Sequence, residues 1–241
     1  MKYLIIIPAR FKSSRFPGKP LANIGGKSML FRVWQKCVQV APSKDVLVAT
    51  DDLRIQNHCK MMGMRSVLTK KSCLTGTDRI SEVSKKYKAD FYINVQGDEP
   101  FVKKSDIKKI INAAKKNPLM VHNAMCKINK KKEIQSHNVP KVVVNIKNNL
   151  LYISRSPIPG NKKNKINQTM KQVCIYSFSK NSLDKFSSTK KKTPLEYIED
   201  IEILRFLELG IEVKMVEVSN SSLAVDTPND LILANKIFKK K

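Results

Sequence analysis

The sequence lacks the features that mark membrane-spanning, disulfide-linked and zinc-binding proteins. No run of about eighteen apolar residues is present, so no segment is predicted to cross a membrane as a helix. The five cysteines form no CxxC pair, and the three histidines have no metal-ligand spacing. This pattern argues against a zinc site and favours reduced thiols. The apolar run near the N-terminus, Leu4 to Ile7, is too short for a signal peptide, so we expect a cytoplasmic protein.

Acidic and aromatic residues are also scarce. Lys and Arg number 46 and Asp and Glu 20, which gives a formal net charge of +26, while aromatic residues make up only 7%. A nucleic-acid interface would favour arginines interleaved with aromatic platforms. Only eight of the basic residues are Arg, and many of the lysines fall in runs such as Lys130 to Lys132. We therefore expect no nucleic acid, and interpret the lysine excess as a solvated face that attracts anionic substrates.

The apolar residues that are present alternate between strand-like and helix-like patterns. The 41% apolar content of 241 residues is enough for one large core. Strands are predicted at 3–7, 46–49, 66–68 and 91–95, and amphipathic helices near 29–37, 53–62, 77–84 and 105–114, with Thr77, Asp78 and Ser105 as cap candidates. This alternation predicts βαβ units, and hence an α/β fold with a mostly parallel central sheet.

The pattern changes after about residue 140. Two strands, 142–146 and 150–153, are followed by a polar loop at 159–169 and by a strand at 173–178. Pro194 is predicted to open one helix over 195–209, which Gly210 ends; a strand at 213–218 and a helix from Pro228 complete the chain. We expect one domain over residues 1–241, with a smaller β-rich lobe at about 140–210 for sugar binding or dimerisation.

A basic loop follows the first strand. It contains Arg10, Lys12, Arg15, Gly18 and Lys19. Ligands of α/β sheets bind at the carboxyl ends of central strands, and Arg and Lys side chains with backbone amides can hold a polyphosphate. The loop lacks the GxxxxGK[ST] pattern, so it is not a Walker loop. The alternative is a basic surface loop.

Two aspartates each follow a predicted strand. Asp98 follows the strand at 91–95 within Gln96-Gly97-Asp98, and Asp226 lies between a strand and a helix. If the fold brings these carboxylates together they can bind Mg²⁺, which favours oxygen ligands. With the basic loop, this predicts metal-assisted phosphoryl or nucleotidyl transfer. An ordinary turn for Asp98 and a helix cap for Asp226 are the alternatives.

Three further segments are candidates. Gly76-Thr77-Asp78-Arg79 opens a helix whose N-terminus would favour an anion. Arg155, at a strand end beside two prolines, suits a carboxylate. Glu196 and Glu199 are three residues apart on a predicted helix and could bind sugar hydroxyls. A capped surface helix and a solvated acidic face are the alternatives for the first and the last.

Together and in this order, the segments resemble the cytidylyltransferases that activate 3-deoxy-D-manno-octulosonate (Kdo). The matching stretches are IIIPARFKSSRFPGKPL, VATDD, GTDRISEV, INVQGDEP, YISRSPIP, PLEYIEDIEILR and AVDTPNDL, from residue 4 to about 231. The resemblance implies a Rossmann-like nucleotidyltransferase core with a smaller dimerisation lobe. It also implies that CTP and Kdo give CMP-Kdo and pyrophosphate for lipopolysaccharide precursors, that Mg²⁺ is the cofactor, and that the protein is a homodimer.

The resemblance also implies roles for individual residues. Arg10 and Lys19 would hold the CTP phosphates, with support from Arg15. Asp98 and Asp226 would bind Mg²⁺ and, with Arg10 and Lys19, form the catalytic set. The cytidine pocket would be lined by Pro8, Ala9, Gly76, Thr77 and Arg79. The sugar acid would contact Gln96, Arg155, Gln172, Tyr176, Glu196 and Glu199.

One stretch departs from the family pattern. Family members commonly carry His-Leu-Gly-Ile-Tyr where this chain has Gln172-Val173-Cys174-Ile175-Tyr176, and the loop at 160–169 is unusually basic. Both changes concern the expected sugar site rather than the nucleotide site. An amino-substituted Kdo, another 2-keto-3-deoxy acid or a sialic-type acid therefore stays open as the substrate.

Overall fold

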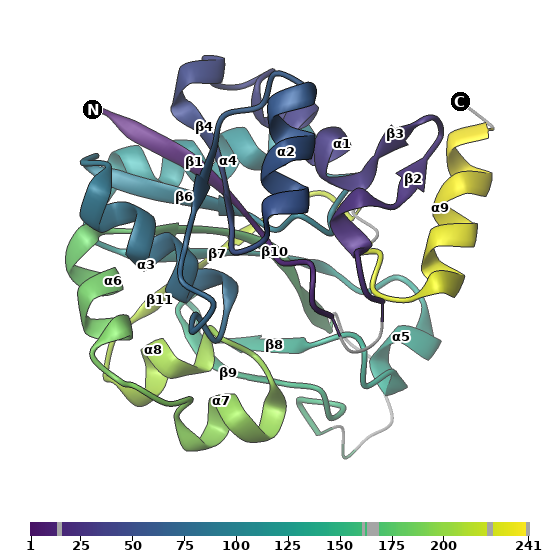
Figure 1. Cartoon of the computed structure of the whole chain (residues 1–241). Helices are drawn as coiled ribbons and strands as arrows, with labels where there is room; N and C mark the ends of the chain where they lie inside the picture. Colours follow the sequence, from purple (N-terminus) through teal and green to yellow (C-terminus); the bar gives the residue numbers. More distant parts are fainter. Residues whose placement is uncertain (14–15, 161, 163–168, 221–223, 240–241) are drawn as a thin grey trace.

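A nine-stranded sheet forms the centre of the computed structural model, which describes residues 1–13, 16–160, 162, 169–220 and 224–239 (Figure 1). The strand order is β11-β7-β10-β6-β1-β4-β5, and β8 pairs with β10 and with β9. The strands are β1 (Tyr3–Ala9), β4 (Val46–Thr50), β5 (Ser66–Leu68), β6 (Phe91–Val95), β7 (Val121–Lys127), β8 (Lys141–Val144), β9 (Leu150–Ser154), β10 (Met170–Phe178) and β11 (Val213–Glu217). Strands β6, β1, β4 and β5 run parallel, whereas β10 is antiparallel to β6 and β7. The α/β fold with parallel strands at its centre is confirmed.

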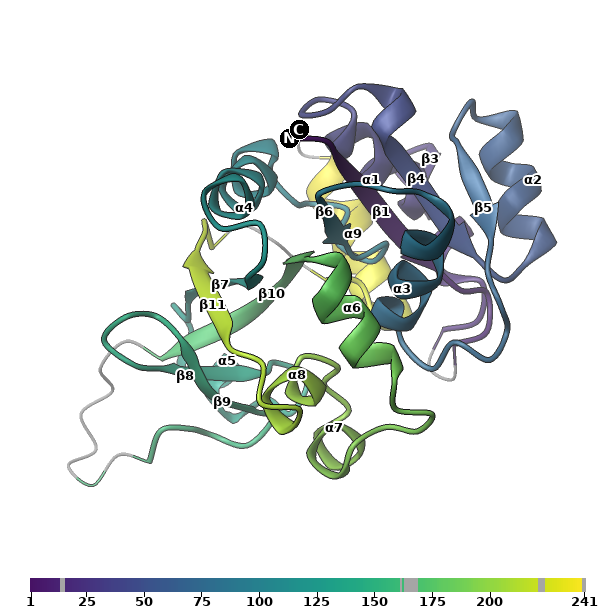
Figure 2. The same cartoon turned by 90° about the vertical axis from the view of Figure 1, so that its left-hand side faces the viewer.

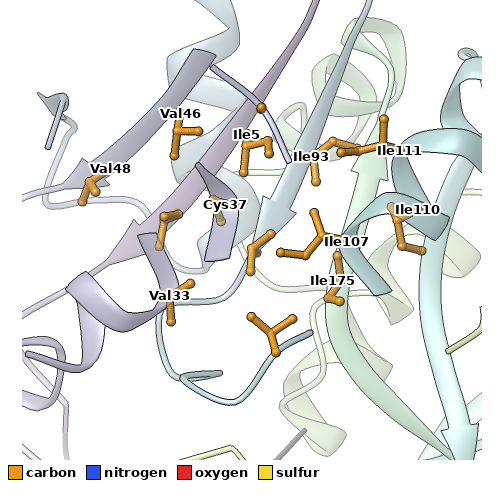
Figure 3. Packing of buried hydrophobic residues seen from close by; sticks show 14 of the residues in the cluster. Ile5, Val33, Cys37, Val46, Val48, Ile93, Ile107, Ile110, Ile111 and Ile175 are labelled. Carbon is orange, nitrogen blue, oxygen red and sulfur yellow. The ribbon is translucent and has the colours of Figure 1, made fainter. Parts of the chain in front are cut away.

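Helices cover both faces of the sheet. Alternate residues of β1 point to opposite faces, so Ile5 packs on one side and Ile6 on the other. The first face is covered by α1 (Met29–Cys37), α2 (Leu53–Met61) and α4 (Lys104–Lys116). Figure 3 shows Val33 of α1 and Ile107 of α4 packed against this face. The second face is covered by α3 (Gly76–Lys86), α6 (Lys180–Ser187) and α8 (Leu204–Glu208), and Figure 2 shows α3 and α6 on the side of the sheet away from α4.

The C-terminal helix α9 (Pro228–Lys239) packs on the small hairpin of β2 (Asn23–Ile24) and β3 (Lys27–Ser28). The Asn235 side chain accepts a hydrogen bond from the Gly25 amide at 3.0 Å, and Ile24 and Ala234 share a buried cluster. This contact anchors the segment that carries Asp226 beside the loop after β1. The remaining short elements are η1 (Lys19–Leu21), η2 (Ser43–Asp45), α5 (Lys131–Gln135) and α7 (Pro194–Glu199).

The single helix predicted over 195–209 is wrong. The chain forms α7 and α8 instead, separated at Asp200, whose φ is 50°. The Glu208 carboxylate accepts hydrogen bonds from the backbone amides of Leu195 and Glu196 at 2.9 and 3.1 Å. It therefore satisfies the first turn of α7, which requires the chain to fold back rather than continue as one helix.

Other local predictions also need correction. Strand β7 is missing from the prediction, because its apolar residues are interrupted by the buried polar pair His122 and Asn123. Ser105 lies inside α4, and the N-cap position belongs to Lys103. Thr75 is the N-cap of α3, where it forms a capping box with Asp78.

No helix in the described ranges is long and apolar enough to span a membrane. All five cysteines are free. The predicted lobe contributes β8 and β9 to the central sheet through β10, and its role in dimerisation stays a prediction.

Candidate active site

A cavity of about 570 Å³ opens at the carboxyl ends of β1 and β6. Most of the candidate residues line it: Pro8, Ala9, Arg10, Lys19, Gly76, Arg79, Gln96, Asp98, Arg155, Gln172, Tyr176 and Asp226. Three candidates are not among the lining residues that the structure describes, namely Thr77, Glu196 and Glu199. Arg15 lies outside the described residues. The structure therefore brings most of the candidates that were named from the sequence to one cavity. Their individual roles stay predictions.

We divide residues that line the cavity into two groups and name them by the roles that the resemblance implies. The phosphate end is our name for Arg10, Lys19, Asp98 and Asp226. The acid end is our name for Gln96, Arg155, Gln172, Tyr176 and Glu202, which accepts a hydrogen bond from Gln96.

At the phosphate end, the Lys19 ammonium joins the two candidate metal ligands. Lys19 Nζ lies 2.8 Å from Asp98 Oδ2 and 2.9 Å from Asp226 Oδ1. Burial lowers the pKa of Lys19, but the charges of Asp98 and Asp226 outweigh it, so the net pKa is raised and the lysine is held as a cation. Two carboxylates thus converge on one positive charge from residues far apart in the sequence.

Backbone geometry explains this convergence. Gly18 adopts a left-handed φ of 71°, and its amide donates to the Phe11 carbonyl at 2.9 Å, which closes the basic loop before Lys19. The amide of Val225 donates to the Asp98 carbonyl at 3.0 Å, so the chain before Asp226 is attached to the loop after β6. In the sequence, the signals for these contacts are Gly18 and Asp226, which precedes Thr227-Pro228.

Two glycines allow the loops to approach each other. A Cβ on Gly97 would lie 3.0 Å from the Pro8 carbonyl oxygen, and a Cβ on Gly76 would lie 2.9 Å from Gln96 Nε2. A side chain at Gly97 would press on the backbone of Pro8 in β1, whereas one at Gly76 would meet the side chains of Gln96 and Pro8. Gly97 is therefore needed where the loop after β6 packs against the backbone of β1, and not for a positive φ.

The start of α3 differs from expectation. Arg79 is only 3% exposed and donates to Asp51 Oδ2 at 2.7 Å and to Thr69 Oγ1 at 2.6 Å. The guanidinium therefore links α3 to the ends of β4 and β5. Its edge still lines the cavity, but most of its hydrogen bonds serve the scaffold.

Glu202 is a cavity residue that the sequence analysis missed. Its carboxylate accepts from Gln96 Nε2 at 2.9 Å and from the Thr77 amide at 3.0 Å. Burial raises the pKa of Glu202, although the Thr77 amide hydrogen bond lowers it. Nothing in its sequence context separates it from the acidic residues nearby, because the break between α7 and α8 brings it to the cavity.

Arg155 is held by backbone carbonyls at the acid end. Its Nε donates to the Glu199 carbonyl at 2.6 Å, Nη1 to the His137 carbonyl at 2.9 Å and Nη2 to the Asp200 carbonyl at 3.1 Å. The Glu199 carboxylate accepts from the Arg155 amide at 2.8 Å. Glu199 thus supports Arg155, and the guanidinium is fixed in place with donors to spare.

Glu196 serves the scaffold. It is fully buried, and its two carboxylate oxygens accept from Arg205 Nε and Nη2 at 2.6 and 2.7 Å. Arg205 is also fully buried and reaches Asp78 at 3.0 Å. The predicted face shared by Glu196 and Glu199 is therefore absent, because Glu196 points into the protein.

The comparison with known proteins agrees with this site. Residues 4–215 match a family model described as Cytidylyltransferase. The chain belongs to this cytidylyltransferase family. It is accordingly a nucleotidyltransferase, as the motifs predicted.

Individual relatives match over nearly their full length. The 3-deoxy-manno-octulosonate cytidylyltransferase of Escherichia coli is 37% identical over 227 residues, which cover 94% of this chain and 92% of the relative. The mitochondrial 3-deoxy-manno-octulosonate cytidylyltransferase of Arabidopsis thaliana is 35% identical over 98% of this chain and 83% of its own. The resemblance to this group of cytidylyltransferases is confirmed.

Solved structures support the same conclusion. A CMP:2-keto-3-deoxy-manno-octonic acid synthetase complexed with CTP has a TM-score of 0.92 and 36% identity, and the match covers 100% of this chain and 99% of the other. A 4-diphosphocytidyl-2C-methyl-D-erythritol synthase from Anaerococcus prevotii has a TM-score of 0.64 at 15% identity, which shows the shared fold alone.

Proposed function

We propose that this chain joins CTP to Kdo, giving CMP-Kdo and pyrophosphate. The observation that carries the proposal is the cavity whose phosphate end gathers Arg10, Lys19, Asp98 and Asp226, in a chain that matches Kdo cytidylyltransferases along its length. The anomeric hydroxyl attacks the α-phosphorus, a new P–O bond forms, and the bond to the β-phosphate oxygen breaks. Pyrophosphate leaves with the electron pair of that bond, and the hydroxyl proton passes to solvent.

The basic residues of the phosphate end act on the leaving group. Arg10 is exposed beside the cavity, with Nη1 3.5 Å from the Leu74 carbonyl, so its guanidinium remains accessible to a phosphate. Lys19 is half-buried and held by two carboxylates, which places a fixed positive charge near the departing pyrophosphate. No side-chain nucleophile is required.

The carboxylates at the phosphate end suit Mg²⁺. Asp98 and Asp226 already share one cation, the Lys19 ammonium, so their oxygens are arranged around positive charge. Within the described ranges no group of three or more His, Cys, Asp or Glu side chains could hold a metal. Mg²⁺ commonly combines one or two carboxylates with substrate phosphates, so Asp98 and Asp226 would hold a metal that arrives with CTP. When bound, Mg²⁺ would neutralise the charge that develops on the phosphate oxygens.

At the acid end, a carboxylate-bearing substrate meets Arg155, Gln96 and Gln172. Arg155 keeps spare N–H donors for a bidentate contact with the acid. Gln96 is oriented by Glu202, which accepts from its Nε2. A 2-keto sugar acid carries a carboxylate that the Arg155 guanidinium can bind. It also carries several hydroxyls, which the side-chain amides of Gln96 and Gln172 can bind.

Pyrophosphate release tests this function directly. The purified chain with Mg²⁺ is incubated with CTP, UTP, ATP or GTP, each paired with Kdo, an amino-substituted Kdo or a sialic acid. Release with CTP and Kdo alone is the expected outcome. Release with CTP and a different acid would move the substrate assignment while preserving the nucleotide assignment. Absence of CTP binding would overturn the proposal.

We further propose a cytoplasmic homodimer. The supporting feature is the exposure of large apolar side chains in the predicted lobe, where Leu151 of β9 is 57% exposed and Tyr197 and Ile198 of α7 are 76% and 75% exposed. Exposed large apolar side chains commonly mark contacts with another protein when they form a contiguous surface. Sedimentation equilibrium should give twice the chain mass, and the monomer mass for Tyr197→Asp.

A further inference from the structure

Strand β10 bulges where it passes the acid end. Val173 pairs with Ala124 of β7, but the next paired residue on β10 is Tyr176, opposite Asn123. Cys174 and Ile175 are therefore extra residues without a partner on β7. Bulges next to active sites commonly redirect side chains, and Gln172, Cys174 and Tyr176 all line the cavity.

Asn123 fills the gap that the bulge leaves. Its side chain is fully buried, and Nδ2 donates to the Val173 carbonyl at 3.0 Å and to the Ile175 carbonyl at 3.1 Å. The carbonyl between them, that of Cys174, accepts from the Gln96 amide at 3.2 Å. All three carbonyls of the bulge are thus satisfied, two of them by one side chain.

These bonds fix the orientation of the Asn123 amide. Carbonyl oxygens only accept hydrogen bonds, so Nδ2 has to face both of them. The opposite atom, Oδ1, then accepts from Gln172 Nε2 at 2.8 Å. An acceptor at this point requires the nitrogen of Gln172 to face Asn123, so the Gln172 carbonyl oxygen, Oε1, is left for the substrate side.

We infer that Asn123 is a positioning residue that makes Gln172 present Oε1 to a hydroxyl of the acid substrate. The inference rests on the proposed function and deepens it. It assigns Gln172 an acceptor role with a fixed direction, supplied by a buried residue that does not itself line the cavity. A second, unused N–H of Gln172 can donate to the same substrate.

Steady-state kinetics with variants tests the inference. Asn123→Ala, Gln172→Met and the double variant are compared with the unaltered chain by pyrophosphate release, varying Kdo and CTP separately. Each single variant should raise the KM for Kdo about 10-fold, the effect of one hydrogen bond to a polar group, and leave the KM for CTP within about twofold. The double variant should raise the KM for Kdo no further than Asn123→Ala alone, because both changes remove the same contact. Asn112→Ala, on the exposed side of α4, is the matched control and should change neither KM.

Other outcomes overturn the inference. Additive effects in the double variant would mean that Asn123 does not act through Gln172. Equal rises in the two KM values would indicate a general structural defect, and an unchanged KM for Kdo would remove the role altogether.

A second measurement requires neither activity nor a folded Asn123 variant. In the unaltered chain, one of the two side-chain amide protons of Gln172 should exchange slowly with solvent, because it is donated to buried Oδ1; the signals are identified by their loss in Gln172→Met. Fast exchange of both protons would overturn the inference. Failure of the unaltered chain to use Kdo would instead overturn the proposed function, so the two failures are distinguishable.

Discussion

The phosphate end and the acid end of the cavity are built by different means. At the phosphate end, the loop after β6 approaches the backbone of β1, and Gly97 leaves the room for this contact. At the acid end, side chains are held by buried polar groups on other elements, such as Asn123 behind Gln172. The residues of the first end lie in short motifs that the fold brings together, whereas the side chains of the second end are oriented by buried residues of other elements. Changes at the two ends should therefore differ in kind.

The buried ion pair of Glu196 and Arg205 should give the largest effect on stability. Glu196→Ala leaves Arg205 fully buried with only Asp78 as its acidic partner, so the free energy of unfolding should fall by about 3–5 kcal/mol. Urea unfolding measures this. Glu217→Ala removes a carboxylate 3.9 Å from Lys127 on the surface and should change stability by less than about 1 kcal/mol. A KM for Kdo that rises much more than the KM for CTP would restore Glu196 as a substrate contact.

Low pH should lower the free energy of unfolding through His122, which lies in β7. Burial lowers the pKa of His122 from 6.5 to about 4, with a smaller contribution from the charge of Lys214. Below pH 6.5 the unfolded chain binds a proton that the folded chain excludes, so stability is lost as pH falls from 6.5 to about 4. The loss reaches about 3 kcal/mol, since each unit corresponds to about 1.4 kcal/mol.

Urea unfolding between pH 4 and 7 measures this slope. His122→Gln should remove most of it, whatever its own stability at pH 7. His137→Gln removes an exposed imidazole and is the control. Equal slopes for all three proteins would contradict the assignment.

Removing a carboxylate at the phosphate end should act on turnover. Asp98→Ala should lower kcat by at least about 100-fold, the loss seen when a key electrostatic group is removed. The KM for Kdo should change little, because Asp98 belongs to the other end of the cavity. Asp184→Ala, which removes a surface carboxylate paired with Lys180, is the control. Near-normal turnover of Asp98→Ala at saturating Mg²⁺ would refute the metal assignment.

Adding one methyl group should test the contact between the loops. The Cβ of Gly97→Ala would lie 3.0 Å from the Pro8 carbonyl oxygen, so the loop after β6 has to shift away from the end of β1. We expect a stability loss of about 1–3 kcal/mol, typical of overpacking, together with weaker CTP binding. A Cβ on Gly160 meets no atom of the described residues within 4 Å, so Gly160→Ala should leave both unchanged. Equal CTP affinity for the two variants would show that the contact is not needed.

The same contrast explains what could be predicted from the sequence. Strands β1, β4, β5 and β6 and the loops after them were predicted, because apolar runs and glycine-containing motifs are local signals. Lys19, Asp98 and Asp226 could be grouped because each lies in a short motif between predicted elements, in which a glycine or proline is a local signal. Glu202 and Asn123 could not, since their roles depend on a break between two helices and on a bulge opposite β7. Glu196 was expected on a face shared with Glu199. Helical spacing alone does not show that Glu196 pairs with the buried Arg205 in the interior.

Arg155 offers the finest test of the comparison, since its position depends on three backbone carbonyls from two separate segments. Lysine keeps the charge but supplies a single ammonium, which cannot reach the carbonyls of His137, Glu199 and Asp200 together. Arg155→Lys should therefore raise the KM for Kdo about 10-fold, the loss of roughly one charge-assisted hydrogen bond, while the KM for CTP stays within about twofold. Arg65→Lys, at an exposed position, is the control. If Arg155→Lys instead raised both KM values equally, the acid end would not be independent of the phosphate end, and the loops and the buried polar supports would have to act as one unit.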